Sequence, residues 1–140
     1  MFELNYVRDE DKPYWRTLDK KLGEAELDLK IRDKRGYVLW ADGVPVGVMR
    51  YNLFWDIFPF LNLISLEEAH QGKGFGRQAM AAWEEEMRKL GYPMVMLSTQ
   101  VDEGAQHFYR KLGYLDKGSL FFDGTPHKQA QELFMIKVFS

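Results

Sequence analysis

The sequence contains no cysteine, and this absence excludes several kinds of chemistry. Disulfide bonds, thiolate nucleophiles and thiolate metal ligands are impossible without that side chain. No apolar run reaches the roughly 18 residues of a membrane-spanning helix, and the N-terminal MFELNYVRDEDK lacks the apolar segment of a signal peptide. We therefore expect a cytoplasmic protein that has no membrane partner.

An excess of basic residues is missing as well. The 19 lysines and arginines stand against 21 acidic residues, which gives a formal net charge of −2 at pH 7. A general nucleic-acid surface needs a basic excess, so we expect no nucleic-acid partner. The histidines, His70, His107 and His127, are scattered along the chain. Without cysteines or clustered histidines, the sequence predicts no metal site.

The residues that are present are those of a globular protein. Of the 140 residues, 46% are hydrophobic and 29% are charged, whereas a disordered chain has fewer apolar residues. A chain of this length can bury a substantial core and is typical of one domain. We therefore expect a single domain over residues 1–140.

The spacing of apolar residues predicts strands and helices that intermingle along the chain. Asp42-Gly43, with β-branched and aromatic residues on both sides, indicates a tight hairpin turn within 36–55. The expected fold class is α/β (α+β), with one central mixed sheet of about six to seven strands and helices on both faces. The other strands are expected over 2–7, 60–66, 93–99, 118–124 and 132–139, and the helices over 9–23, 24–36, 77–91 and 102–113.

The helix over 77–91 has the clearest apolar stripe. Met80, Trp83, Met87 and Leu90 recur at spacings of three and four, which places them on one face of a helix. The three consecutive glutamates at 84–86 lie mostly off that stripe. We expect the stripe to be buried and the glutamates to be solvated.

The ends of the helices also carry recognisable signals. Gly23 is expected to end the first helix, and Asp102 is expected to cap the last one. The sequence RKLGY occurs at Arg88–Tyr92 and again at Arg110–Tyr114. In each copy, basic residues in the last turn precede a glycine suited to a left-handed cap, and the aromatic residue folds back.

The stretch QGKGFGR, residues 71–77, lies between a predicted strand and a predicted helix. Glycines allow backbone N–H groups to turn inward and allow a ligand to approach closely, and the helix N-terminus adds the positive end of its dipole. Lys73 and Arg77 add positive charge. The pattern predicts a site for a phosphate or pyrophosphate. A tight connection that simply needs glycine is the alternative.

Other glycine-rich loops fit this stretch poorly. A P-loop needs a serine or threonine after its Gly-Lys pair, and none stands at that place. A dinucleotide-binding loop follows the first strand with the spacing G-x-G-x-x-G, whereas Gly72, Gly74 and Gly76 are spaced by two in the middle of the chain.

Two motifs together resemble one known family. Gln71-x-x-Gly74-x-Gly76 resembles the Q/R-x-x-G-x-G/A motif of the GNAT acetyltransferase superfamily. VDEGAQHFYRKLGY resembles that family's second signature, in which a turn opens a helix reading A-x-x-F-Y-x-K-x-G-F. The resemblance extends over essentially the whole chain and is strongest from about 60 to 114. The second signature is matched by Ala105, Phe108, Tyr109, Lys111, Gly113 and Tyr114.

The resemblance implies a mostly antiparallel GNAT-like sheet whose strands splay beside the loop, and acetyl-CoA as the acetyl donor. Backbone groups of Ser65 and Leu66 would pair with the pantetheine arm, and an amide near Leu66 would polarise the thioester carbonyl. Tyr109 would be the catalytic acid that protonates the leaving thiolate, although it could also pack in the apolar stripe of its helix. The pyrophosphate would bind the amides of Gln71, Gly72, Lys73, Gly74, Phe75, Gly76 and Arg77.

The remaining site residues follow less directly from the motifs. Asp102 stands where the family usually has an asparagine that contacts the cofactor arm, and an ionised aspartate can accept but not donate a hydrogen bond. Glu67, Glu68 and Asp56 lie at predicted strand ends, where each could be the catalytic base or an ordinary exposed charge.

The expected acceptor is the primary amine of a small molecule. Aromatic and acidic residues are numerous in the segments that would line its groove, and they suit an ammonium-bearing ligand. A protein lysine or N-terminus is the second candidate acceptor. A non-catalytic module that binds acyl-CoA is the third hypothesis, and an inert Tyr109→Phe substitution with retained cofactor binding would favour it. Exposed hairpin edges could support a homodimer.

Overall fold

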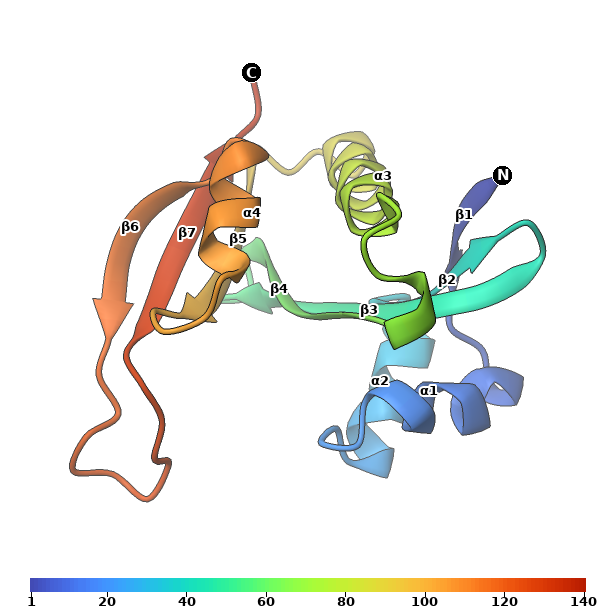
Figure 1. Ribbon diagram of the computed structural model, residues 1–140, viewed down its shortest axis with the longest axis horizontal. Coiled ribbons are helices and arrows are strands. Elements are labelled where there is room, and N and C mark those ends of the chain that lie inside the picture. Colours follow the sequence, from blue (N-terminus) through green and yellow to red (C-terminus); the bar gives the residue numbers. More distant parts are fainter.

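A single seven-stranded sheet runs through the computed structural model, which describes residues 1–140 (Figure 1). Its strands lie in the order β1-β2-β3-β4-β5-β7-β6, and all neighbours are antiparallel except β4 and β5. The expected mixed, mostly antiparallel sheet is thus confirmed. The strands are β1 (Phe2–Tyr6), β2 (Gly36–Ala41), β3 (Val44–Phe54), β4 (Phe58–Leu66), β5 (Met94–Gln100), β6 (Leu115–Leu120) and β7 (Glu132–Val138).

Helices cover both faces of this sheet, as predicted. Helices α1 and α2 lie below it in Figure 1, and α3 and α4 lie above it. None of the helices combines the length and apolar character that crossing a bilayer requires. The helices are α1 (Lys12–Leu18), α2 (Glu24–Asp33), α3 (Phe75–Lys89) and α4 (Ala105–Lys111), with short 3-10 turns at Asp9–Asp11 and Glu68–His70.

The first hairpin has the turn that the sequence predicts. Asp42 and Gly43 have φ values of +52° and +79°, and β2 and β3 pair on either side of them. Two consecutive positive φ values match the right-handed twist of the strands, and glycine adopts such values without strain.

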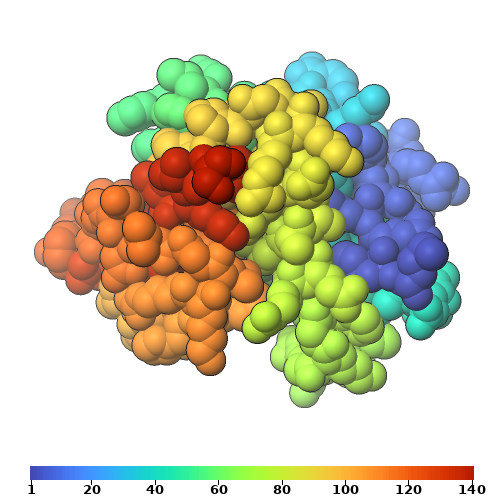
Figure 2. All heavy atoms as spheres, turned by 90° about the horizontal axis from the view of Figure 1, so that it is seen from above, coloured from blue at the N-terminus to red at the C-terminus, as the bar shows by residue number.

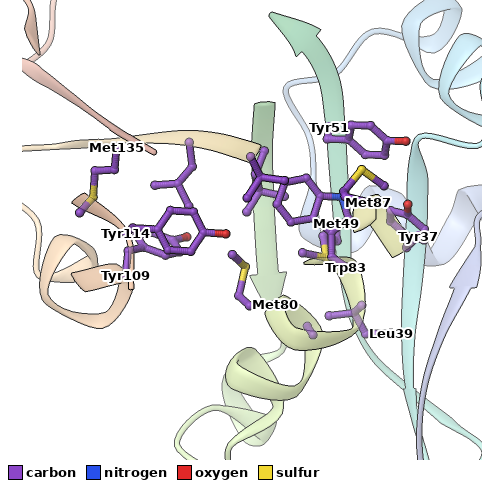
Figure 3. Close-up of a cluster of buried hydrophobic side chains, with 14 of the residues drawn as sticks. Tyr37, Leu39, Met49, Tyr51, Met80, Trp83, Met87, Tyr109, Tyr114 and Met135 are labelled. Carbon is purple, nitrogen blue, oxygen red and sulfur yellow. The ribbon is translucent and has the colours of Figure 1, made fainter. Parts of the chain in front are cut away.

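The larger core lies between the sheet and the upper helices. Met80 and Trp83 of α3 lie between Tyr109 on one side and side chains of β2 and β3 on the other (Figure 3). Met87 completes the buried part of the stripe. Leu90 was expected in the stripe too, but it is 59% exposed because α3 ends at Lys89.

A smaller core lies between the sheet and the lower helices. Trp15 of α1 and Leu27 of α2 are fully buried against Val38 and Val48, on the sheet face opposite the larger core. Leu27 is the buried residue of α2. Each sheet face thus has its own apolar layer.

The prediction that one helix runs to Gly23 is wrong. Helix α1 ends at Leu18, and Gly23 precedes the first residue of α2. The carboxylate of Asp19 accepts hydrogen bonds from the backbone N–H groups of Lys21 and Leu22. It thereby offers the chain a turn in place of another helical turn.

The glutamates of α3 are not all solvated, which corrects a second expectation. Glu84 is 4% exposed and accepts hydrogen bonds from Tyr114 and Lys137. Glu86 accepts hydrogen bonds from the hydroxyls of Tyr6 and Tyr37. The position of these glutamates off the apolar stripe does not make them solvated, because polar partners from distant parts of the chain hydrogen-bond to their carboxylates.

The last part of the chain also differs from two expectations. Gly104, not Asp102, occupies the N-cap of α4, and Asp102 is exposed in the preceding turn. The strand expected over 118–124 is β6, which ends at Leu120. Both RKLGY copies end their helices as predicted, since Gly91 and Gly113 have φ values of +91° and +98°.

Candidate active site

The sheet opens between its two central strands. β4 and β5 pair only through Phe60 with Met96 and Leu61 with Leu97. Beyond these pairs the strands diverge, although β4 continues to Leu66 and β5 to Gln100. The expected splay is therefore present, and it leaves one edge of β4 without a strand partner.

The register of β4 determines which of its backbone groups face this opening. The N–H of Glu67 donates to the carbonyl of Val46, and opposite residues in an antiparallel pair alternate between bonded and unbonded positions. Ser65 therefore directs its backbone groups to β3. Ile64 and Leu66 direct theirs into the opening. Of the two residues predicted to pair with a ligand here, only Leu66 has a free backbone group on this side, its N–H, because its carbonyl accepts a hydrogen bond from the side chain of Gln71.

The glycine loop follows the Leu66 end of β4 and borders this opening. Gly72 and Gly74 have φ values of +76° and +85°, and α3 begins directly after Gly74 without a side-chain cap. The first intrahelical bond runs from Gln78 to Gly74, and no turn, loop or cap bond is donated by an amide of 72–77. This run of unpartnered amides at a helix N-terminus is suited to an anion.

The charged side chains of the loop are also without protein partners. Lys73 and Arg77 are exposed, and neither is among the ion pairs of the molecule. Gln71 instead donates from its side chain to the carbonyl of Leu66, which ties the loop to the end of β4. A Cβ at Gly76 would lie 3.5 Å from the ring of Phe108. Glycine there keeps the space between α3 and α4 open.

These elements enclose a cleft of about 630 Å³, which we call the loop cleft. Gly72, Gly74 and Arg77 line one side of it, and Phe108 and Tyr109 of α4 line the other. Seen from above, the loop and α3 face α4 across a furrow (Figure 2). The two predicted motifs therefore lie on opposite walls of one cleft.

Tyr109 lies at the inner end of the loop cleft. Its side chain is 9% exposed, and its hydroxyl has no hydrogen-bond partner in the protein, whereas Tyr114 beside it bonds to Glu84. Burial, together with the negative charge of Glu103, raises the pKa of Tyr109 to about 12. The phenol therefore keeps its proton at neutral pH and can donate it to a group in the cleft.

A second cleft of about 420 Å³ begins where the loop cleft ends, and we call it the acceptor cleft. Tyr109, Ile64 and Ala105 line both clefts. Lys21, from the α1–α2 connection, and Gln129, from the β6–β7 connection, border the acceptor cleft. Its other lining residues are Leu61, Asn62, Leu63, Leu97, Ser98, Thr99, Gln100, Glu103 and Glu132.

The carboxylates that the sequence suggested as bases line neither cleft. Glu67 accepts a hydrogen bond of 2.7 Å from Tyr14 of α1, on the lower side of the sheet. Asp56 lies exposed in the β3–β4 turn, at the end of β4 remote from the loop, with a φ of +61°. Glu68 is exposed in the 3-10 turn before the loop. Asp102 also lines neither cleft.

The cleft residues that the sequence did not predict include Ile64, Ser98, Glu103 and Glu132. No local motif marks Glu132, which begins β7 and reaches the site because β7 pairs with β5. Ile64 could have been found only from the register, because a bulge at Asn62 shifts the pairing of β4 with β3.

Comparison with known proteins agrees with this geometry. A sequence profile described as the acetyltransferase (GNAT) family matches residues 4–114. The chain belongs to the GNAT acetyltransferase family. Acetyltransferase activity with acetyl-CoA as the donor is therefore the activity that membership supports. No sequence among curated proteins matches this chain.

Solved structures share the fold across the whole chain. A putative streptothricin acetyltransferase from Bacillus anthracis, in complex with acetyl-CoA, is 15% identical, with a TM-score of 0.83 over 100% of this chain and 98% of that one. Ard1 from Thermoplasma volcanium is 17% identical, with a TM-score of 0.82 over 99% and 98%. Ribosomal-protein-alanine N-acetyltransferase from Brucella melitensis is 20% identical, with a TM-score of 0.80 over 98% and 99%. At these identities the likeness shows the fold.

Proposed function

We propose that this GNAT protein transfers an acetyl group from acetyl-CoA to a primary amine of a small molecule. The observation that carries the proposal is the position of Tyr109, whose unpartnered hydroxyl lies where the loop cleft meets the acceptor cleft. A donor in one cleft and an acceptor in the other would meet at this phenol. The two reactants would thus be held for direct transfer in a ternary complex.

The loop cleft suits acetyl-CoA in charge and in shape. The unpartnered amides of 72–77, with Lys73 and Arg77, would hold its pyrophosphate. The backbone groups of Ile64 and the N–H of Leu66 would pair with its pantetheine arm, as an added strand pairs with an open sheet edge. Bound there, acetyl-CoA supplies an activated thioester.

Two groups of the protein would then support the chemistry. The N–H of Leu66 faces the opening and is placed to donate to the thioester carbonyl oxygen as negative charge develops on it. Tyr109 stays protonated and would give its proton to the leaving sulfur.

The acceptor nitrogen must lose protons for the transfer to occur. Of the predicted carboxylates, Glu67 directly follows Leu66 in the chain; because it lines neither cleft, it would receive a proton only through water. Asp56, in the remote turn, has no part in this proposal.

The acceptor cleft supports a small molecule over a peptide. Its volume of about 420 Å³ is in the range of small-molecule sites. Lys21 and Gln129 border it from two different connections of the chain. Glu103 and Glu132 make it suitable for a positively charged amine. A peptide N-terminus or lysine would leave most of its chain outside this cleft.

The first test is calorimetric titration with acetyl-CoA, CoA and ATP. We expect acetyl-CoA and CoA to bind and ATP to bind far more weakly, because ATP has no pantetheine arm for the edge of β4. A thiol-release assay over a set of small amines and peptides should then give turnover with small amines. If none of the three ligands binds, the loop only turns the chain and the proposal fails. Turnover with peptides alone would instead mean that the acceptor is a protein lysine or N-terminus.

A further inference from the structure

The carboxylate of Glu132 lies in the acceptor cleft with both oxygens held by neutral donors. Ser98 donates from its hydroxyl to one oxygen at 2.6 Å, and Gln129 donates from its side-chain amide to the other at 2.8 Å. Glu132 takes part in none of the ion pairs of the molecule. The donors fix the direction of the carboxylate but leave it without an ion-pair partner, although Lys21 borders the same cleft, and each oxygen can still accept another hydrogen bond.

The inner end of the same cleft has the opposite character. Leu61 and Leu97 line it beside Tyr109, whose side chain is buried and whose hydroxyl has no hydrogen-bond partner in the protein. Among apolar side chains the charged form of an amine is disfavoured, so its pKa falls and the neutral amine is favoured. Only the neutral amine is a nucleophile. The inner end is therefore suited to the reacting nitrogen, while Glu132 is suited to an ammonium.

We propose that Glu132 determines acceptor specificity by binding a second ammonium group, and that the acceptor is a diamine or polyamine. This inference rests on the proposed function, and it adds the chemical class of the acceptor. An amine held as an ammonium by a carboxylate cannot attack the thioester, so the nitrogen that Glu132 binds differs from the nitrogen that is acetylated. Ser98 and Gln129 act as positioning residues, since they orient the carboxylate without neutralising it.

The test compares an α,ω-diamine with the n-alkylamine of the same chain length, over several lengths. Both are titrated calorimetrically onto the protein in the presence of CoA, and kcat/KM is measured for both with acetyl-CoA. We expect the wild-type protein to bind the best diamine about 10- to 100-fold more tightly than the monoamine of the same length. This difference corresponds to the contribution of one hydrogen bond to a charged group. Glu132→Gln keeps the shape of the side chain and should remove most of this preference.

Glu85→Gln is the matched control, because Glu85 is exposed on α3 and lines neither cleft. It should retain the preference for the diamine. We expect the affinity for CoA to be the same in all three proteins. An unchanged affinity in Glu132→Gln shows that this variant is folded.

Several results would overturn the inference while leaving the proposed function intact. These are equal binding of diamine and monoamine by the wild-type protein, no binding of the diamine, or an unchanged preference in Glu132→Gln. Failure of CoA to bind, or of acetyl transfer to any amine, would instead contradict the proposed function itself. An equal loss of kcat/KM for both amines in Glu132→Gln would make Glu132 a proton acceptor, not a specificity determinant.

Discussion

The carboxylate of Glu84 accepts a 2.8 Å hydrogen bond from the hydroxyl of Tyr114 in the interior of the protein. Glu84 belongs to α3, which begins at the glycine loop, whereas Tyr114 follows α4, which carries Tyr109. The ring of Tyr114 also packs edge-on against that of Tyr109, with centroids 5.8 Å apart. One buried contact thus fixes the spacing of the two helices that face each other across the loop cleft.

Replacing Glu84 with alanine should destabilise the protein strongly. The substitution leaves the hydroxyl of Tyr114 and the ammonium of Lys137 without their shared acceptor. We expect the free energy of unfolding to fall by about 3 kcal/mol, the loss typical of breaking a buried, hydrogen-bonded pair. Urea denaturation at neutral pH measures it. Glu85, the next residue of α3, is exposed, and Glu85→Ala should change the free energy of unfolding by less than about 0.5 kcal/mol. Similar losses in the two variants would contradict a structural role specific to Glu84.

Substitutions at Gly74 can separate strain from charge in the loop. Asn and Asp have nearly the same shape, and both tolerate the left-handed conformation that Gly74 adopts at φ +85°. A Cβ added there meets no protein atom within 4 Å, so both variants should fold. We expect Gly74→Asp to bind CoA about 10- to 100-fold more weakly than Gly74→Asn, because its negative charge repels the pyrophosphate. Calorimetric titration with CoA measures the difference. Equal affinities in the two variants would mean that the pyrophosphate lies elsewhere.

Local patterns predicted the parts of the fold that depend on neighbouring residues in the sequence. The Asp42-Gly43 turn, the buried Trp83 stripe and the glycine loop are all of this kind, since turn chemistry and helical period act over a few residues. The walls of the loop cleft were also predicted, because both signatures are contiguous in the sequence.

The remaining features depend on contacts between distant residues. Glu84 is buried because Tyr114 and Lys137 reach it, and nothing near Glu84 in the sequence indicates that. Whether Ile64 or Ser65 directs its backbone groups into the opening depends on the register of β4 against β3. Glu132 enters the acceptor cleft through the pairing of β7 with β5, which lies outside both signatures. Pairing partners and register are set by the packing of the whole sheet.

The protein should lose stability in acid through Asp19. Burial alone would raise the pKa of this carboxyl group, but Arg50, at 2.9 Å, and Trp15, at 3.1 Å, outweigh it and hold the pKa below its ordinary value. A carboxyl group whose folded pKa is lowered stabilises the protein above its unfolded pKa of about 3.9 and ceases to do so as the pH falls through the folded value. Asp19→Asn should therefore be less stable than the wild-type protein at neutral pH, and the gap should shrink below about pH 4.

Urea denaturation of both proteins at neutral and acid pH measures that gap. Asp33→Asn is the control, because Asp33 pairs with Arg32 at the surface, where such pairs contribute little. A gap that stays constant with pH would mean that the charge of Asp19 does not stabilise the fold.

Tyr109→Phe should separate catalysis from cofactor binding. Removal of the hydroxyl leaves the packing of the ring in place but takes away the proposed proton donor at the junction of the two clefts. We expect kcat to fall by about 10²- to 10⁴-fold, the contribution typical of a positioned acid, while CoA affinity stays nearly unchanged. Tyr92→Phe removes a phenol that lines neither cleft and should leave both quantities unaltered.

The pH profile of the wild-type enzyme provides an independent check on the same phenol. The pKa of Tyr109 is raised to about 12, so the proton it must donate is present throughout the neutral and mildly alkaline range. The acceptor amine, in contrast, gains nucleophilicity as the pH rises toward its own pKa, which is about 10.4 for a free lysine-type amine and lower among apolar side chains. We therefore expect kcat to rise from neutral pH to a plateau, with no descending limb up to about pH 10. A decline between about pH 8 and pH 10 would require a donor with a lower pKa, and Tyr109 would then be a packing residue of α4.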